Sequence, residues 1–190
     1  TIGPSIPVFE GSKPYQQLVF QYSLHIQEIS GSESIHKEYL ADPKEDPRIK
    51  FIEQLILDCG VSGDILVYNI GFEKGKIEDL IETFPEHSIE LQKIISRLKD
   101  LMVPFQKKWY YTPKMRGSYS IKQVLPALVP ELSYNDLEIN EGGNASNTFL
   151  SMVNGTFKGN ESQTRKSLLE YCKMDTYAMV KIVEKLNEIK

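Results

Sequence analysis

The spacing of apolar residues changes along this 190-residue chain, and that change most limits what it can fold into. Between Gln17 and Ile29 apolar and polar residues alternate, which predicts a half-buried strand. The residues expected on its apolar face are Leu18, Phe20, Tyr22, Leu24 and Ile26. A turn and a shorter strand near residues 35–40 complete an antiparallel hairpin. From residue 46 onward apolar residues recur mainly every three or four positions, as in helices. Two early strands followed by alternating helix and strand predict a mixed-sheet α/β domain.

Turn and cap signals divide the remainder of the chain into elements. Asp46-Pro47 predicts the start of a helix that ends at Gly60. The short apolar run from Asp64 to Asn69 predicts a central strand buried on both faces. Further helices are expected over residues 72–84, 88–99, 120–129, 145–153 and 161–189, with a glycine-rich loop at 141–144. Residues 1–14 hold three prolines and two glycines and are expected to form an irregular lead-in to one domain spanning 1–190.

Composition removes several classes of protein. With 41% hydrophobic and 25% charged residues the chain is an ordinary globular sequence rather than a disordered or fibrous one. No run approaches the ~18 consecutive apolar residues of a membrane span, so we expect a soluble, cytoplasmic protein with no membrane partner. The two cysteines, Cys59 and Cys172, form no C-x-x-C pair, and the chain has only three histidines, which argues against zinc.

Charge is distributed unevenly along the chain. The formal net charge is -4, yet residues 101–130 contain no Asp or Glu. The basic residues of this segment are Lys107, Lys108, Lys114, Arg116 and Lys122, and its aromatic residues include Trp109, Tyr110, Tyr111 and Tyr119. Cations suit phosphates and ring faces suit bases, so the segment predicts binding of a nucleic-acid strand. A solvated loop with a few core tyrosines remains an equal alternative.

Two acids fall on helix faces that should point inward. Asp175 interrupts an apolar stripe of the last helix and lies one turn after Tyr171, so a phenol and a carboxylate share one face. Glu73 lies four residues before Ile77 in the helix that follows the strand ending at Asn69, where open α/β sheets place ligands. The structural alternatives for Asp175 are a partly exposed stripe or a neighbouring cation. For Glu73 the alternative is a favourable helix-dipole position, with Asn69 as a cap.

Together the two acids suggest a metal site. Oxygen ligands without His or Cys favour Mg²⁺ or Mn²⁺, which commonly join protein carboxylates to substrate phosphates. Two such ions can position a water and stabilise the leaving oxygen of a phosphodiester. The basic, aromatic segment would then supply the substrate strand.

At these residues the chain resembles the tyrosine branch of the DEDD exonuclease superfamily, which has a ribonuclease H-like fold. Tyr68-Asn-Ile-Gly-Phe-Glu73 is similar to one of its motifs, with Glu in place of the usual Asp, and Tyr171-Cys-Lys-Met-Asp175 matches its Y-x-x-x-D motif. More narrowly, four strings resemble a bacterial family catalogued as domain of unknown function 2779. They are PYQQLVFQYSLHI (14–26), VYNIGFEKGKI (67–77), GSYSIKQVLPALVPELSY (117–134) and LLEYCKMDTYAMV (168–180).

The resemblance implies a ribonuclease H-like mixed sheet flanked by helices and metal-dependent 3′-to-5′ hydrolysis of DNA or RNA. Glu73 and Asp175 would be catalytic and would ligate Mg²⁺ or Mn²⁺, and Tyr171 would orient the attacking water. Asn69 would support the site or contact substrate, and Asp100 has no assigned catalytic role. The substrate-binding residues would be Lys107, Lys108, Lys114, Arg116, Lys122 and Tyr119.

The chain departs from the superfamily at its first motif, D-x-E, because no such pair precedes Phe20. In the narrow family an Asp-Phe-Glu-Thr string comes before the lead-in, so Thr1 corresponds to its last letter and the first catalytic strand is expected to be missing. This fragment should therefore bind metal weakly and show little nuclease activity. Two alternatives remain, a non-catalytic nucleic-acid-binding module and a protein-interaction domain that keeps the fold.

Overall fold

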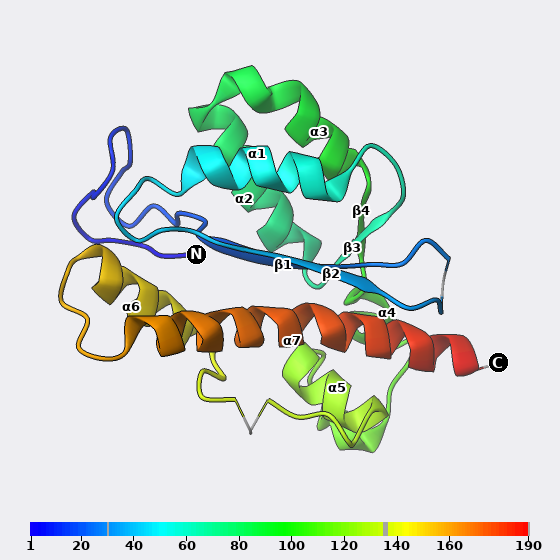
Figure 1. Ribbon diagram of the computed structural model, residues 1–190. Coiled ribbons are helices and arrows are strands. Elements are labelled where there is room, and N and C mark those ends of the chain that lie inside the picture. The colour runs from blue at the N-terminus through cyan, green and yellow to red at the C-terminus, as the bar shows by residue number, and fades with distance from the viewer. Residues whose placement is uncertain (30, 135–136, 190) are drawn as a thin grey trace.

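The computed structural model describes residues 1–29, 31–134 and 137–189. Its strands and long helices form three layers, with a strand hairpin between two sets of helices (Figure 1). The strands are β1 (Gln21–Ile26), β2 (Ile35–Leu40), β3 (Ile65–Val67) and β4 (Leu98–Asp100). On one side of the hairpin lie α1 (Arg48–Cys59), α2 (Ile70–Thr83) and α3 (Ser88–Ser96), with a short 3-10 turn η1 (Pro85–His87). On the other lie α5 (Ile121–Leu128), α6 (Gly142–Val153) and α7 (Glu161–Glu188).

The expected hairpin is present, but its apolar residues do not share one face. β1 and β2 pair antiparallel from Gln21 opposite Leu40 to Ile26 opposite Ile35. Phe20 packs into the core beside α7, where its ring stacks on Phe149 at 4.2 Å between centroids, whereas Tyr22 packs into the core formed with α1. The expectation of a single face was wrong because regular pairing starts only at Gln21, and the irregular residues before it break the alternation.

The predicted central strand is also shorter and more exposed than expected. β3 covers three residues, its Leu66 side chain is 41% exposed, and it pairs in parallel with β4 alone. Within the described part of the chain, no strand joins β3 to β1, so two separate two-stranded sheets result. A strand buried on both faces needs neighbours that these residues do not provide.

Residues 88–99 were expected to be one helix, but the helix ends at Ser96 and residues 98–100 form β4. The cause is a long-range contact, because the Arg97 guanidinium donates to the carbonyls of Cys59 (3.1 Å), Gly60 (3.0 Å) and Ser62 (2.5 Å). These bonds tie the end of α3 to the loop before β3 and align the two strands.

The remaining expectations are mostly confirmed. α1, α2, α5 and α7 lie within a few residues of their predicted bounds. The expected glycine-rich loop was wrong, since α6 already begins at Gly142 with Glu141 as its N-cap. The basic segment contains α4 (Val103–Gln106) and a 3-10 turn η2 (Pro113–Met115). The lead-in is anchored, because Ile2 is buried and forms an antiparallel bridge with Leu18.

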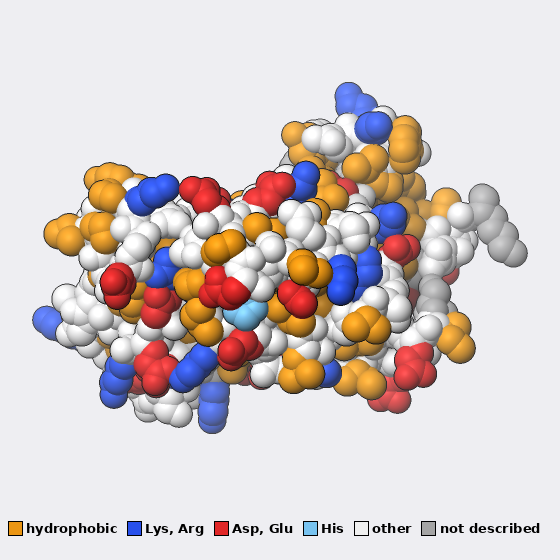
Figure 2. All heavy atoms as spheres, turned by 90° about the horizontal axis from the view of Figure 1, so that it is seen from above, with side chains coloured by type: hydrophobic (Ala, Val, Ile, Leu, Met, Phe, Trp, Pro, Cys, Tyr) orange, Lys and Arg blue, Asp and Glu red, His pale blue; other side chains and the backbone are white. Residues whose placement is uncertain are grey.

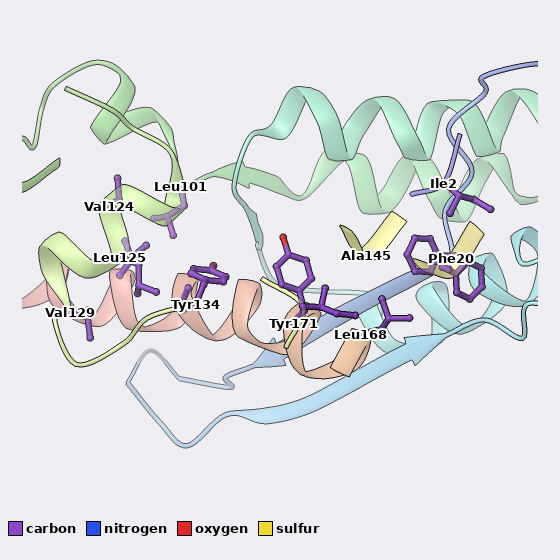
Figure 3. Packing of buried hydrophobic residues seen from close by; sticks show 14 of the residues in the cluster. Ile2, Phe20, Leu101, Val124, Leu125, Val129, Tyr134, Ala145, Leu168 and Tyr171 are labelled. Carbon is purple, nitrogen blue, oxygen red and sulfur yellow. The ribbon is translucent and has the colours of Figure 1, made fainter. Parts of the chain in front are cut away.

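Apolar side chains gather into two clusters, one on each side of the hairpin. In the cluster on the α7 side, Figure 3 shows Tyr171 between Tyr134 on one side and Ile2 and Phe20 on the other. On the outer face formed by α1 to α3, acidic, basic and apolar side chains are interspersed (Figure 2). Among the described residues, no helix has both the length and the apolar character to cross a membrane.

Candidate functional site

The turn from β3 into α2 is fixed by one carboxylate. Asp100, at the end of β4, accepts hydrogen bonds from the backbone N–H groups of Asn69 (3.1 Å), Ile70 (3.0 Å) and Met102 (2.9 Å). An acid at the N-terminus of a helix satisfies donors that have no partner within the helix. Asn69 itself is exposed, has a left-handed φ of 82°, and makes no side-chain cap bond. Asp100 therefore holds the first turn of α2, from which Glu73 projects.

Asp175 lies on the stripe of α7 where the spacing placed it. The stripe residues Leu168, Tyr171, Ala178 and Ile182 are buried. Burial raises the pKa of Asp175 above its ordinary value, while the hydroxyls of Tyr134 and Tyr171 and the charge of Lys122 oppose the rise. A carboxylate loses hydration when protein surrounds it, so its neutral form gains.

Glu73 is exposed by area, yet protein on several sides desolvates its carboxylate and raises its pKa. A large exposed area and strong desolvation occur together when a side chain lies in a depression of the surface that water can enter. The positive N-terminal amino group lowers the pKa of Glu73, and the negative charge of Asp175 raises it. The structure therefore brings the two predicted acids, from α2 and α7, into one electrostatic environment, with Tyr171 facing Asp175.

Thr1 lies at the same place, within electrostatic range of Cys172 and Glu73. Desolvation likewise raises the pKa of the Cys172 thiol to about 12. The Thr1 carbonyl accepts a hydrogen bond of 2.6 Å from Ser146 on α6. Thr1 and Cys172 were not predicted site residues, because their proximity depends on how the lead-in and α7 pack.

Lys122 and Tyr134 complete the surroundings of Asp175. The ammonium group of Lys122 lies 5.6 Å from the ring centroid of Tyr134 and 5.9 Å from that of Tyr171, within the range of cation–π attraction. It also donates a 2.6 Å hydrogen bond to the carbonyl of Asn140. Tyr134 was missed by the sequence reasoning, since it lies outside any helix or strand and no periodicity marks it.

The basic residues divide into two groups. Lys114, Arg116 and Lys122 line a cavity of about 470 Å³ whose wall includes Tyr134. Lys107 and Lys108 do not line it, and the ammonium of Lys107 lies 5.4 Å from the ring centroid of Trp109. Tyr119 is 45% exposed, and its carbonyl accepts a 2.7 Å hydrogen bond from the Tyr68 hydroxyl. The structure thus gathers three of the five predicted cations around one cavity, and one of them, Lys122, also acts on Asp175.

The two carboxylates supply only part of a metal site. Glu73 and Asp175 could give a divalent ion two of its oxygen ligands, and Mg²⁺ generally completes such a shell with water and substrate phosphates. Within residues 1–29, 31–134 and 137–189, no three His, Cys, Asp or Glu side chains are grouped so that they could hold a metal. The described acids therefore do not form the complete two-metal site that the motifs imply.

These features define an α/β domain with small sheets flanked by helices and an acidic pair next to a cationic cavity. The chain belongs to the family described as Domain of unknown function (DUF2779), whose model matches residues 1–120. It is 29% identical over 163 residues to an uncharacterized protein, UU173, of Ureaplasma parvum, which covers 75% of this chain and 23% of that protein. It is 27% identical over 201 residues to the uncharacterized protein MG366 of Mycoplasma genitalium, covering 96% of this chain and 30% of that protein. The chain thus spans less than a third of either relative, and no solved structure matches it significantly.

Proposed function

We propose that this domain belongs to a metal-dependent nuclease that hydrolyses phosphodiester bonds from the 3′ end of DNA or RNA. The observation that carries the proposal is the meeting of Glu73 and Asp175 in one desolvated environment. The charge of Asp175 raises the pKa of Glu73, and a cation held by both carboxylates would relieve that repulsion. The cationic cavity next to Asp175 supports a polyanionic substrate.

In this proposal Glu73 and Asp175 hold Mg²⁺ or Mn²⁺, which would lower the pKa of a bound water and offset charge on the phosphate. The Tyr171 hydroxyl orients the attacking water, since it faces Asp175 from one turn earlier on the same helix. Lys122 keeps a positive charge near the carboxylate end of the site, where it attracts the substrate and opposes protonation of Asp175.

We further propose a ribonuclease H-like sheet in which one more strand joins the two observed sheets. In its favour, the bridge between Ile2 and Leu18 is antiparallel, and the Thr1 amino group lies near Glu73. If the parent protein continues before Thr1, this register sets the preceding residue opposite Phe20 and runs the segment along β1. A D-x-E motif there would bring two further acids to Glu73 and Asp175.

A second candidate is a nucleic-acid-binding module without catalysis. The specific observation in its favour is that the described residues provide two acids and no larger cluster of metal ligands. Glu73 also has a longer side chain than the Asp usual at this position, which would displace a bound ion.

The test compares this chain with one extended upstream by its parent sequence. We expect Mn²⁺-dependent release of nucleotides from a 3′-labelled strand in the extended protein and little in residues 1–190. Asp175→Ala should abolish release, and Tyr171→Phe should lower it by roughly 10² to 10⁴-fold, as for loss of an orienting or acid–base group.

The matched control on α2 is Glu78→Ala, because Glu78 faces Lys74 on the surface rather than the site. Glu73→Ala should abolish release, whereas the control should keep it. An extended protein that binds single strands but releases nothing with Mn²⁺ would favour the non-catalytic module. Full activity of Asp175→Ala would exclude the assigned metal site.

A further inference from the structure

The cavity beside Asp175 is built mainly from positive and hydrogen-bonding groups. Lys114 and Arg116 come from the end of η2, and Lys122 comes from the first turn of α5. Among the described residues, none of the three forms a salt bridge. Glu141 is the acid that lines the same cavity. The cavity therefore carries an excess of positive charge that its own side chains leave uncompensated.

A backbone turn and a buried tyrosine fix the edge of this cavity. Arg116 has a left-handed φ of 50°, which is uncommon for a residue other than glycine, and Gly117 follows with a φ of 77°. This turn ends η2 with Arg116 at the cavity rather than in a continued helix. Tyr134 is 6% exposed and lines the same cavity, and its hydroxyl faces the Asp175 carboxylate. The phenol thus connects the cavity to the acid.

Size and lining indicate which ligand fits. The cavity volume of about 470 Å³ falls within the usual range of small-ligand sites. It suits a single nucleotide rather than a long stretch of strand. The cations match a phosphate, and the amides of Gln123 and Asn140 can read a base edge. Pro126 and Ala127 add an apolar wall. Lys122 lines this cavity and its charge also acts on Asp175, so a nucleotide seated here would lie near that acid.

We infer that this cavity binds one nucleotide unit of the substrate, with its phosphate on Lys114, Arg116 and Lys122. The inference rests on the proposed nuclease function and deepens it by assigning a subsite for the nucleotide next to the reacting bond. The same chemistry could come from a strand or from a free nucleoside monophosphate.

The experiment measures binding of a labelled single-stranded oligonucleotide to residues 1–190 by fluorescence anisotropy, in EDTA so that no hydrolysis occurs. Lys114→Gln/Arg116→Gln should weaken binding by about 10-fold or more, since each phosphate contact contributes to both affinity and salt slope. The control Lys44→Gln/Lys93→Gln removes the same charge at two exposed lysines outside the cavity and should weaken binding by less than about 3-fold. Equal losses in the two double variants would overturn the inference.

A variant that binds more tightly cannot owe its effect to misfolding, so a second test seeks a gain in affinity. Glu141→Gln removes the opposing charge and should tighten binding by about 2 to 5-fold, on the scale of a partly exposed charge pair. No change in this variant would count against the cavity. Competition by unlabelled nucleoside monophosphate would show that the cavity takes a free nucleotide, whereas competition only by oligonucleotide would assign it to a strand. Because no metal is present, a failed nuclease assay leaves this result intact, and a failed binding result leaves the metal assignment intact.

Discussion

At the level of single residues, the proposed metal ligand Asp175 carries a cost in stability. Its carboxylate lies among Tyr134, Tyr171 and Lys122, and burial raises its pKa despite these partners. An acid whose pKa rises on folding favours the fold while protonated and costs free energy as pH climbs through the raised pKa. A bound cation, as in the proposed metal site, would offset the negative charge of the Asp175 carboxylate and with it this cost.

We therefore expect Asp175→Asn to stabilise the fold at pH 7 by about 0.5 to 2 kcal/mol, as is common when a strained site is neutralised. Urea denaturation followed by circular dichroism measures the change. The gain should shrink toward pH 4, where the native carboxyl also becomes neutral. Asp64→Asn, at an exposed acid, is the control and should change stability by less than about 0.5 kcal/mol. A loss of stability in Asp175→Asn would show that the tyrosines and Lys122 outweigh burial.

The sequence predicted the residues on α7 better than those around it. A helical period alone placed Tyr171 and Asp175 on one buried stripe. It could not reveal that Tyr134 would reach Asp175 from a loop or that Thr1 would lie beside Glu73. Those contacts depend on how distant segments pack, which local spacing does not encode.

At the level of elements, α6 is joined to the hairpin through one aromatic pair. Phe149 is fully buried and stacks on Phe20 with an interplanar angle of 11°. Offset or stacked rings add to the free energy gained from burying their area. This pair links the start of β1 to α6, whose Ser146 also holds Thr1.

Phe149→Ala should destabilise the protein by about 3 to 5 kcal/mol, the usual cost of removing a buried phenyl group. Thermal or urea unfolding measures it. The control is Phe72→Ala, since Phe72 is 42% exposed on α2 and should cost far less. Similar effects of the two substitutions would mean that α6 is not tied to the hairpin through this ring.

The sequence predicted the elements that form through interactions between neighbouring residues. It did not predict those that depend on contacts with distant segments. The long C-terminal helix follows from its own spacing and is capped by Asn160, whose side chain accepts a hydrogen bond from the Gln163 N–H. β4 depends instead on Arg97 binding the loop before β3. The burial of β3 also depends on distant segments. Its short apolar run predicted burial on both faces, but the neighbouring elements leave it partly exposed.

For the molecule as a whole, the hairpin and α7 are joined by a polar network. Thr176 lies 2.7 Å from the Ser23 hydroxyl and 2.9 Å from Nδ1 of His25, and His36 lies 2.9 Å from Ser23. Burial, helped by the charges of His36 and Lys173, lowers the pKa of His25 to about 4. The pKa of His36 is lowered by burial too, and Glu38 opposes that shift. The network therefore needs neutral histidines.

A histidine whose pKa falls on folding binds more protons when unfolded, so stability declines as pH drops from 6.5 toward 4. We expect His25 to contribute about 1 to 2 kcal/mol to that decline, after allowing for the water that reaches it. Urea midpoints of the native protein and His25→Gln across this range isolate the effect from that of the acids. The urea midpoint of the native protein should fall more steeply than that of His25→Gln as pH drops from 6.5 to 4, and the two plots should be parallel only above pH 7. Parallel plots over the whole range would contradict the assignment.

The surroundings of Trp109 determine what the intrinsic fluorescence of this protein reports. It is the one tryptophan in the sequence, its side chain is 71% exposed, and the Lys107 ammonium lies 5.4 Å from its ring centroid. Intrinsic emission therefore comes from a single indole already in water, on the basic segment itself. Such an indole is well suited to report a base that stacks on it, without any added dye. For the same reason its emission is a poor measure of unfolding, because the ring has little burial to lose.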